Sequence, residues 1–206
     1  MTVTQSLISF IFTITLLVLT PGLDTALVLR TATVDGANRA FRAALGILTG
    51  CCVWGLAAAL GLSAMLAASH IAFEILKWGG ALYLAWVGSQ LLLHPRAHFV
   101  AESQPRTFIA DPFAKGAMQN LLNPKIGVFY ISFLPQFIPH GVEAGPYILM
   151  LAALHVAICL VWFVALILMT HSLAPFMRNP SFVRIMDRVT GIVFVGFGLK
   201  LAFSRN

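Results

Sequence analysis

Charged residues are scarce in this chain of 206 amino acids: Asp, Glu, Lys and Arg make up only 10% of it, and apolar residues make up 59%. Soluble domains carry about 25% charged and roughly 45–50% apolar residues. A soluble domain of this size buries about 70% of the surface of its unfolded chain, and so could not hide this apolar excess. The composition therefore excludes a soluble enzyme, a disordered chain and a secreted disulfide scaffold. It predicts a protein whose main solvent is lipid.

Cysteine is also rare. The chain has three, Cys51, Cys52 and Cys159, and all lie within apolar stretches. An odd number in such places argues against a disulfide framework, and we expect these cysteines to act as small apolar side chains in the packing. No Lys or Arg precedes Arg30, so the N-terminus lacks the basic region of a signal peptide.

Motifs for catalysis and cofactor binding are missing as well. The sequence has no glycine-rich phosphate-binding loop and no recognisable Ser/His/Asp signature. Among the histidines, only His94 and His98 have the spacing of metal ligands, and Pro95 breaks the helix that would align them. We therefore predict neither an enzyme nor a bound metal or cofactor.

Six mostly apolar segments approach the length of about 20 residues that a transmembrane helix needs. They cover residues 6–29, 43–68, 71–93, 113–138, 147–169 and 185–203. Backbone polar groups in lipid must be satisfied within the segment, and the strict alternation of a membrane barrel is absent, so we predict helices. The connections at 31–42, 94–112, 139–146 and 170–184 are polar, and residues 1–206 read as one all-α membrane domain.

Basic residues gather on one side of this predicted domain. Counted by loop, one side carries nine Lys or Arg and the other carries three. The nine are Arg30, Arg39, Arg42, Arg96, Arg106, Lys115, Arg178, Arg184 and Arg188, and the three are Lys77, Lys200 and Arg205. This bias predicts that the nine face the cytoplasm and both termini lie outside, the N-terminus changing side if the first segment is re-entrant. Because the net charge of +6 arises mostly in these loops, it does not indicate nucleic-acid binding.

The first and fourth segments are both interrupted, and the interruptions are half a chain apart. Pro21 and Pro124 are separated by 103 residues in a chain of 206. Two halves of three spans each, about 1–95 and 110–206, must be inverted relative to one another. Inverted repeats with broken helices in matching positions are typical of secondary transporters, whose substrate site lies where the breaks meet. The alternative is that each proline only kinks a helix, as prolines in membrane spans often do.

The polar residues at the breaks are the candidate substrate and coupling site. Pro21 and Gly22 are expected to unwind the first segment as far as Asp24. A carboxylate near the centre of a span costs about 2.5–3.5 kcal/mol to insert, so Asp24 indicates a function such as proton uptake and release. The alternative is that Asp24 caps the helix that follows. No second acid lies deep in a predicted span.

In the second break, Pro124 is flanked by polar groups. Lys125 is the only basic residue central to a segment. It is a candidate counter-charge for Asp24 or anchor for a substrate carboxylate, unless it extends to the interface. Asn120 and Asn123 can both donate and accept hydrogen bonds.

Other residues carry weaker indications. His155 either lines the pathway or binds a neighbouring helix, and Gln136 is either part of the pathway or a cap near the outer end. Gly46 and Gly50 form a small-residue face, which favours helix packing over a ligand site.

Two stretches around these residues resemble a known family. Thr20-Pro21-Gly22-Leu23-Asp24 looks like the opening signature of the LysE/RhtB amino-acid exporters, although Leu23 stands where the family usually has a second proline. Asn120-Leu121-Leu122-Asn123-Pro124-Lys125 looks like their second signature. The resemblance extends over essentially the whole chain. It implies export of amino acids or close derivatives from the bacterial cytoplasm, driven by an ion gradient.

Together these features predict a proton antiporter of the inner membrane. Its partners would be a small-molecule substrate (an amino acid), protons and the lipid bilayer, and the sequence is compatible with a homo-oligomer. Two alternative functions remain. One is an exporter of divalent metals or of other small solutes; a metal exporter would need acidic or histidine ligands in several spans, where only Asp24 and His155 qualify. A membrane thiol-disulfide electron conduit would need cysteines beside the two prolines, where Gly22 and Lys125 stand instead.

Overall fold

The computed structural model describes residues 2–20, 22–68, 70–95, 111–139, 141–170, 172 and 179–203. Within these residues the regular elements are all helical and no strand occurs. The predicted all-α class is therefore confirmed for the described part of the chain.

Each half of the chain begins with a broken helical segment and continues with two long helices. In the first half these are α1 (Val3–Leu19), α2 (Leu23–Val34), α3 (Ala37–Ala68) and α4 (His70–Leu93). In the second half they are α5 (Pro112–Leu121), α6 (Pro124–Val128), the π-helical η1 (Phe129–Phe133), the 3₁₀-helical η2 (Leu134–Phe137), α7 (Ala144–Leu168) and α9 (Pro180–Phe203). Both interruptions predicted from the prolines are therefore present.

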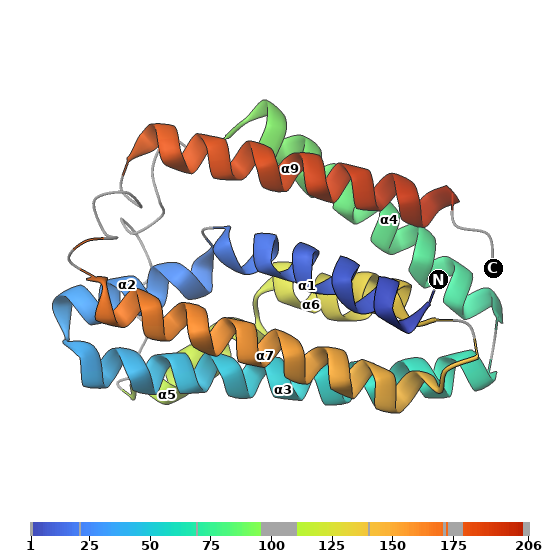
Figure 1. Cartoon of the computed structure of the whole chain (residues 1–206), viewed down its shortest axis with the longest axis horizontal. Coiled ribbons are helices and arrows are strands. Elements are labelled where there is room, and N and C mark those ends of the chain that lie inside the picture. Colours follow the sequence, from blue (N-terminus) through green and yellow to red (C-terminus); the bar gives the residue numbers. More distant parts are fainter. Residues whose placement is uncertain are drawn as a thin grey trace.

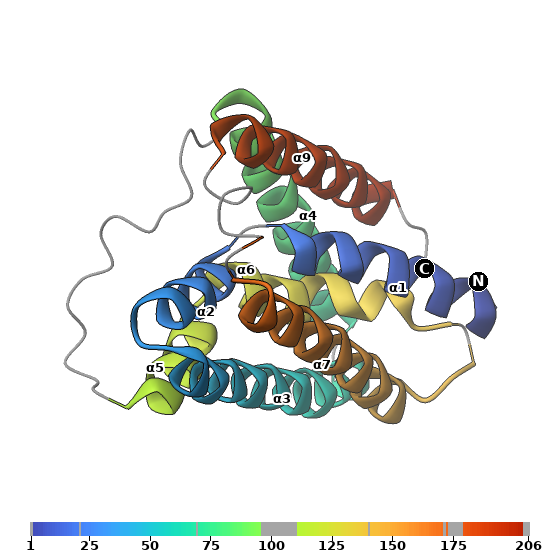
Figure 2. The ribbon, with the colours of Figure 1, turned by 60° about the vertical axis from the view of Figure 1, so that its left-hand side comes forward.

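The helices run along the long axis of the molecule (Figure 1). α1 begins and α9 ends at the same end, whereas the α2–α3 connection and the start of α9 lie at the opposite end. The broken segment α1–α2 runs in one direction along this axis, and α5–α6 with its extension runs in the other. Turning the molecule shows α9 apart from α3 and α7, with α4 running from beside α9 toward the end of α3 (Figure 2).

Several helices have the length and apolarity of membrane spans. Two stretches among the described residues qualify outright, Ala37–Gly61 of α3 and Ala144–Leu168 of α7. The pair α1 and α2, bent by 50°, qualifies as a third if it counts as one span. Large apolar side chains with more than 60% of their surface exposed point outward from several helices: Ile8, Phe12, Leu60, Leu82, Val161 and Ile192. Such surfaces suit lipid rather than water.

Glycines bring two pairs of helices into direct backbone contact. A Cβ on Gly46 of α3 would lie 2.0 Å from the Phe113 carbonyl oxygen of α5, and one on Gly116 would lie 2.1 Å from the Ala43 oxygen. In the α4–α9 pair, a Cβ on Gly88 would lie 2.8 Å from the Gly191 oxygen. The predicted packing role of Gly46 is confirmed, and Gly50 acts in the same interface.

Some helix ends lie outside the predicted segments. The connection predicted at 31–42 is mostly helix, because α2 continues to Val34 and α3 begins at Ala37. Only Asp35 and Gly36 separate them, and Gly36 has a φ of +87°, which favours glycine. α9 likewise begins at Pro180, five residues before the predicted start. A helix can continue through polar residues beyond the lipid. The apolar composition marks only the part of the helix within the lipid, so it misplaced these helix ends.

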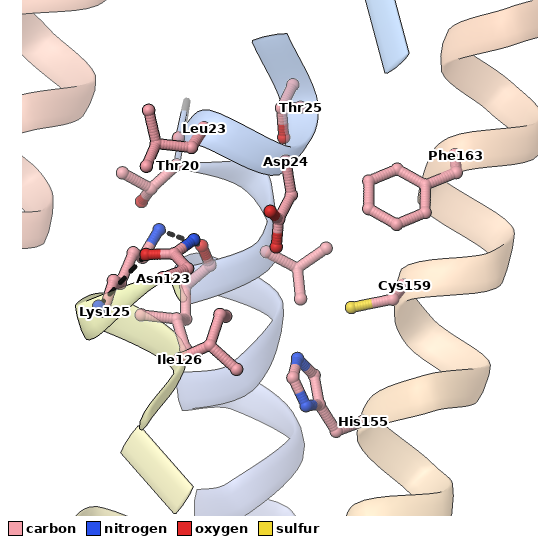
Figure 3. Close-up of a pocket in the computed structure, with 13 residues that line it drawn as sticks. Thr20, Leu23, Asp24, Thr25, Asn123, Lys125, Ile126, His155, Cys159 and Phe163 are labelled. Atoms are coloured by element: carbon pink, nitrogen blue, oxygen red, sulfur yellow. Dashed lines mark hydrogen bonds between the residues drawn. The ribbon is translucent and has the colours of Figure 1, made fainter. Parts of the chain in front are cut away.

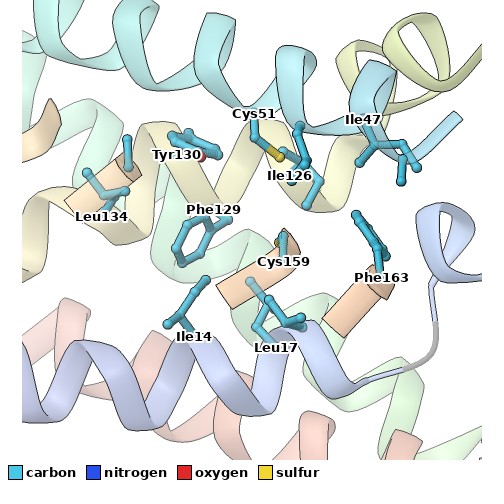
Figure 4. Close-up of a cluster of buried hydrophobic side chains, with 14 of the residues drawn as sticks. Ile14, Leu17, Ile47, Cys51, Ile126, Phe129, Tyr130, Leu134, Cys159 and Phe163 are labelled. Atoms are coloured by element: carbon cyan, nitrogen blue, oxygen red, sulfur yellow. The ribbon is translucent and has the colours of Figure 1, made fainter. Parts of the chain in front are cut away.

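The core joins both halves. Figure 4 shows Ile14 and Leu17 of α1 facing Phe129 of η1, with side chains of α3 and α7 around them. Phe129 and Phe133 belong to a cluster of aromatic rings that also includes Phe10, Phe137 and Phe197. This cluster packs around η1 and η2, the segments that follow α6 after the second break.

Candidate functional site

The end of α1 leaves a carbonyl group that its own helix cannot satisfy. The backbone N–H of Thr20 donates to the Leu16 oxygen at 3.0 Å, and the Thr20 hydroxyl donates to the same oxygen at 2.7 Å. The next carbonyl, that of Leu17, would be paired with the N–H of residue 21 in a continuous helix. Residue 21 is proline, which has no N–H. The Leu17 oxygen accepts instead from the Lys125 ammonium, at 3.1 Å.

The second break explains why Asn, Pro and Lys follow one another. Asn123 is the N-cap of α6, and its side-chain oxygen accepts from the backbone N–H of Lys125 at 3.1 Å. Pro124 occupies the first helical position, where no N–H is needed. Lys125 follows it, on the helix turn nearest α1. The sequence Asn123-Pro124-Lys125 therefore restarts a helix and directs a cation toward the first break.

Asp24 and Asn120 connect the two breaks from the other side. The Asp24 carboxylate accepts a hydrogen bond of 2.8 Å from the Asn120 amide, and both residues are buried. The same amide lies 3.5 Å from the Cys51 sulfur. Among the described residues, the second carboxylate oxygen of Asp24 has no hydrogen-bond partner. A buried acceptor of this kind is costly, so it indicates a place for a proton or a donor.

Two expectations about Asp24 are wrong. The helix resumes at Leu23, so Asp24 lies in the first turn of α2 and not in unwound chain. It is not the cap either, because the N-cap is Gly22 and no side-chain capping bond is present there. Gly22 instead packs against Lys125: a Cβ on it would lie 3.5 Å from the Lys125 nitrogen.

A cavity lies between the breaks and α7 (Figure 3). It holds about 380 Å³ of space between atoms, part of it open to the surroundings. Its polar lining comes from Thr20, Gly22, Asp24, Thr25, Asn123, Lys125 and His155. Its apolar lining comes from Leu17, Val18, Leu23, Ile126, Cys159 and Phe163.

The predicted site residues fall into three groups. Gly22, Asp24, Asn123, Lys125 and His155 all line this cavity. Behind it, Asn120 holds Asp24 and Pro124 opens α6, but neither belongs to the lining. Gln136 does not line it either, since its amide donates to the Ser132 carbonyl at 3.1 Å within η1 and η2. Pro21 lies outside the described residues.

His155 combines the two roles that the sequence left open. It lines the cavity, and its Nδ1 is 2.8 Å from the Tyr130 hydroxyl of η1. Cys159 and Phe163 follow it on the same face of α7. The sequence analysis missed this wall, although the spacing of four residues between the three positions is a signal for one helix face.

Asp187 is a second buried acid that the sequence analysis missed. Its side chain is fully buried, on the second turn of α9. One turn later, the hydroxyl of Thr190 contacts the hydroxyl of Thr20 at the first break. The predicted segment 185–203 puts Asp187 at its third residue, whereas α9 begins at Pro180 and carries Asp187 farther into the helix.

Leu17 and Lys125 also line a second, more apolar cavity toward α4 and α9. Its other lining residues include Tyr83, Phe129 and Phe194. The hydrogen bond between Leu17 and Lys125 therefore lies where two cavities meet.

The family model described as LysE type translocator matches residues 15–205, which include both breaks and all the cavity-lining residues. The chain belongs to the LysE family. No solved structure matches the LysE-family chain.

Relatives of this LysE-family protein align over nearly their whole lengths. It is 31% identical to the uncharacterized membrane protein YrhP of Bacillus subtilis, over 97% of this chain and 100% of the relative. It is 30% identical to the homoserine/homoserine lactone efflux protein of Salmonella typhi, over 96% of each chain. It is 31% identical to the threonine efflux protein of the same organism, over 91% of this chain and 92% of the relative. The resemblance drawn from the two sequence signatures is therefore confirmed.

Proposed function

We propose that this protein is a secondary active exporter of amino acids or close derivatives from the cytoplasm, working by proton antiport. One observation carries the proposal: Asp24 and Lys125, from the breaks of the two halves, line the same cavity. An amino acid has one ammonium and one carboxylate, and this pair of charges complements both.

In the proposed complex, Lys125 binds the substrate carboxylate. Its ammonium lines the cavity, and the hydrogen bond to the Leu17 carbonyl fixes its position there. The start of α6 lies beside it, where the positive end of the helix dipole favours an anion. Charge-assisted hydrogen bonds of this kind are the stronger ones in proteins.

Asp24 then binds either the substrate ammonium or a proton. One carboxylate oxygen of Asp24 has no hydrogen-bond partner among the described residues, so it can accept the substrate ammonium or bind the proton. Protonation removes the negative charge and with it the attraction for the ammonium. A proton arriving from outside therefore displaces the substrate, and a substrate arriving from the cytoplasm displaces the proton. Asn120 holds the other oxygen in either state.

The proposed architecture is six spans arranged as two inverted repeats in the bacterial inner membrane. The matching order of elements in the two halves supports it. So do the opposite directions of the two broken segments (Figure 1). We place the loops rich in arginine in the cytoplasm and the C-terminus outside.

The names of the relatives support the substrate class. Two are named for efflux of homoserine or homoserine lactone and of threonine, and a 25% identical relative in Klebsiella pneumoniae is named a leucine efflux protein. The alternatives have less support. No group of three or more His, Cys, Asp or Glu that could hold a metal occurs among the described residues. Cys51 and Cys159 are buried, and neither belongs to the chain breaks.

Transport by the purified protein in liposomes tests the proposal. Liposomes are loaded with one labelled amino acid at a time, and a pH gradient is imposed with protons in excess outside. We expect protein-dependent efflux that the gradient accelerates and a protonophore slows. If no amino acid leaves, the export proposal is wrong. If efflux ignores the gradient, proton antiport is wrong and amino-acid export stands.

A further inference from the structure

We propose that the cavity selects amino acids with an uncharged apolar side chain, and that Cys159 and Phe163 of α7 form the subsite for that side chain. The proposal rests on the proposed function, since it concerns which amino acid the same cavity takes. It names two specificity-determining residues on a helix that carries neither of the proposed charge-binding groups.

The cavity has two chemically different sides. Figure 3 shows Asp24, Asn123 and Lys125 at the two chain breaks, with Phe163 and Cys159 on α7 across the space from Asp24. Phe163 and Cys159 are almost fully buried, at 3% and 5% exposure. A zwitterion held at the breaks by its two charges would therefore extend its side chain toward a phenyl ring and a thiol.

Charge counting excludes substrates with ionised side chains. Of the described residues that line the cavity, Asp24 is the one carboxylate and Lys125 the one ammonium. A substrate such as lysine would bring two cations to a single carboxylate. A substrate such as glutamate would bring two carboxylates to a single ammonium. In each case one charge would be buried without a partner, which is strongly unfavourable.

Hydroxylated side chains are disfavoured by a similar argument. The Thr20 hydroxyl already contacts the Leu16 carbonyl and Thr190, and His155 Nδ1 contacts the Tyr130 hydroxyl. The other polar lining residues, Thr25 on α2 and Asn123 at the start of α6, lie on the side of the breaks and not at the subsite on α7. At the subsite itself, a thiol and a phenyl ring offer a substrate hydroxyl only weak interactions. A leucine, isoleucine or methionine side chain loses no hydrogen bond on entering such a surface, whereas that of homoserine or threonine does.

Size discrimination should depend on Phe163. Its ring borders the cavity, so Phe163→Ala would extend the space beside the subsite. Pockets of this kind discriminate roughly 10- to 100-fold for each methylene group that they exclude or leave unfilled. The variant should therefore favour phenylalanine over leucine, reversing the order of the unmodified protein.

The test measures kcat/KM for counterflow in liposomes with leucine, methionine, phenylalanine, homoserine, threonine, lysine and glutamate. We expect leucine and methionine to exceed homoserine and threonine at least tenfold, and lysine and glutamate to be at background. Phe163→Ala should raise the ratio of phenylalanine to leucine at least tenfold. Phe12→Ala, which removes a ring exposed on the outside of α1, should leave the ratio unchanged.

The outcomes separate the two proposals. If no amino acid on the panel is transported, the proposed function fails. If amino acids are transported but homoserine, threonine or lysine equals leucine, the export proposal stands and the apolar subsite is wrong. The subsite is also wrong if Phe163→Ala changes all substrates by the same factor, because that result indicates a structural role only. If Phe163→Ala does not fold, the ratio of phenylalanine to leucine transport is measured for Phe163→Leu instead, and that ratio tests the subsite.

Discussion

Lys125, on the first turn of α6, donates a hydrogen bond to the Leu17 carbonyl of α1 across 3.1 Å. The bond exists because the proline at position 21 cannot serve that carbonyl. A cation is thereby held beside the cavity by the backbone of the other half. The same bond makes Lys125 part of the structure as well as part of the proposed site, so its variants must separate the two roles.

The first prediction concerns Asp24. Asp24→Asn keeps an oxygen that can accept from Asn120, so the protein should insert and fold normally. It cannot exchange a proton, and gradient-driven efflux should therefore fall by roughly 10²-fold or more. Efflux from liposomes at several external pH values measures this. Asp35→Asn, the same change at an exposed position at the end of α2, is the control and should behave as the unmodified protein.

Asp187→Asn provides a second comparison, since Asp187 is buried on α9, one turn before the Thr190 hydroxyl that contacts Thr20. If this variant loses the pH dependence of efflux while Asp24→Asn keeps it, the proton role belongs to α9. If Asp24→Asn exports at the normal rate with the normal pH dependence, the proposed role of Asp24 is wrong.

The second prediction separates the two roles of Lys125. Lys125→Gln can still donate to the Leu17 carbonyl but has no charge, so KM should rise about tenfold or more with little loss of stability. Lys125→Met can do neither and should also lower the free energy of unfolding by about 1–3 kcal/mol. Transport kinetics and thermal unfolding in detergent measure the two effects. Lys115→Gln, on α5 and away from the cavity lining, is the control.

The third prediction concerns Asn120. Asn120→Ala removes the amide that serves the Asp24 carboxylate, leaving a buried acid without this donor. We expect a loss of about 1–3 kcal/mol in the free energy of unfolding. The double variant Asn120→Ala with Asp24→Ala should lose less free energy of unfolding than the two single variants lose together. Once the acid is removed, no buried carboxylate is left without its donor. Strict additivity would contradict the coupling.

The fourth prediction concerns the α3–α5 contact. Gly46→Ala would place a Cβ 2.0 Å from a backbone oxygen of α5, so the helices must separate, at a cost of about 1–3 kcal/mol. Gly61→Ala lies in the same helix, where no described atom is within 4 Å of the new carbon. Alanine should be neutral or stabilising there because of its higher helix propensity. In thermal unfolding, the midpoint should fall for Gly46→Ala and should stay unchanged or rise for Gly61→Ala.

The fifth prediction is the orientation in the membrane. In a protein without its native cysteines, Asp35→Cys should resist a membrane-impermeant thiol reagent added outside intact cells. Glu143→Cys, at the start of α7, should react. Both positions are exposed in the structure. The ion pair of 2.6 Å between Arg42 and Asp111 places the starts of α3 and α5 at the same end, as the charge bias requires. External labelling of Asp35→Cys would reverse the assignment.

The two chain breaks were predictable because proline acts locally. A missing N–H and a fixed φ interrupt a helix whatever surrounds it, so Pro124 marked its break directly. The packing role of Gly46 was predictable for a similar reason, since glycine in a lipid-facing helix has few other uses. Asp24 and Lys125 stood out because charges at membrane depth are costly.

The wall of the cavity on α7 was not predictable in the same way. Cys159 and Phe163 belong to an apolar helix with no charge to mark one face, so its rotation depends on packing against α1, α3 and η1. The burial of Asp187 was missed because it depends on where α9 begins. The polar residues before Asp187 concealed that start. Both features arise from contacts distant in sequence, which composition and spacing do not contain.

Three hydrogen bonds at and near the site join the first half of the chain to the second. Asp24 is served by Asn120, the Leu17 carbonyl by Lys125, and the Phe137 carbonyl by the Ser6 hydroxyl. While α1 to α4 leave the ribosome, their donors and acceptors on the other half have not yet been synthesised. The growing chain therefore holds an acid and an orphaned carbonyl in or near the bilayer until α5 and α6 arrive. Insertion of the second half is the step that completes the folding of the first.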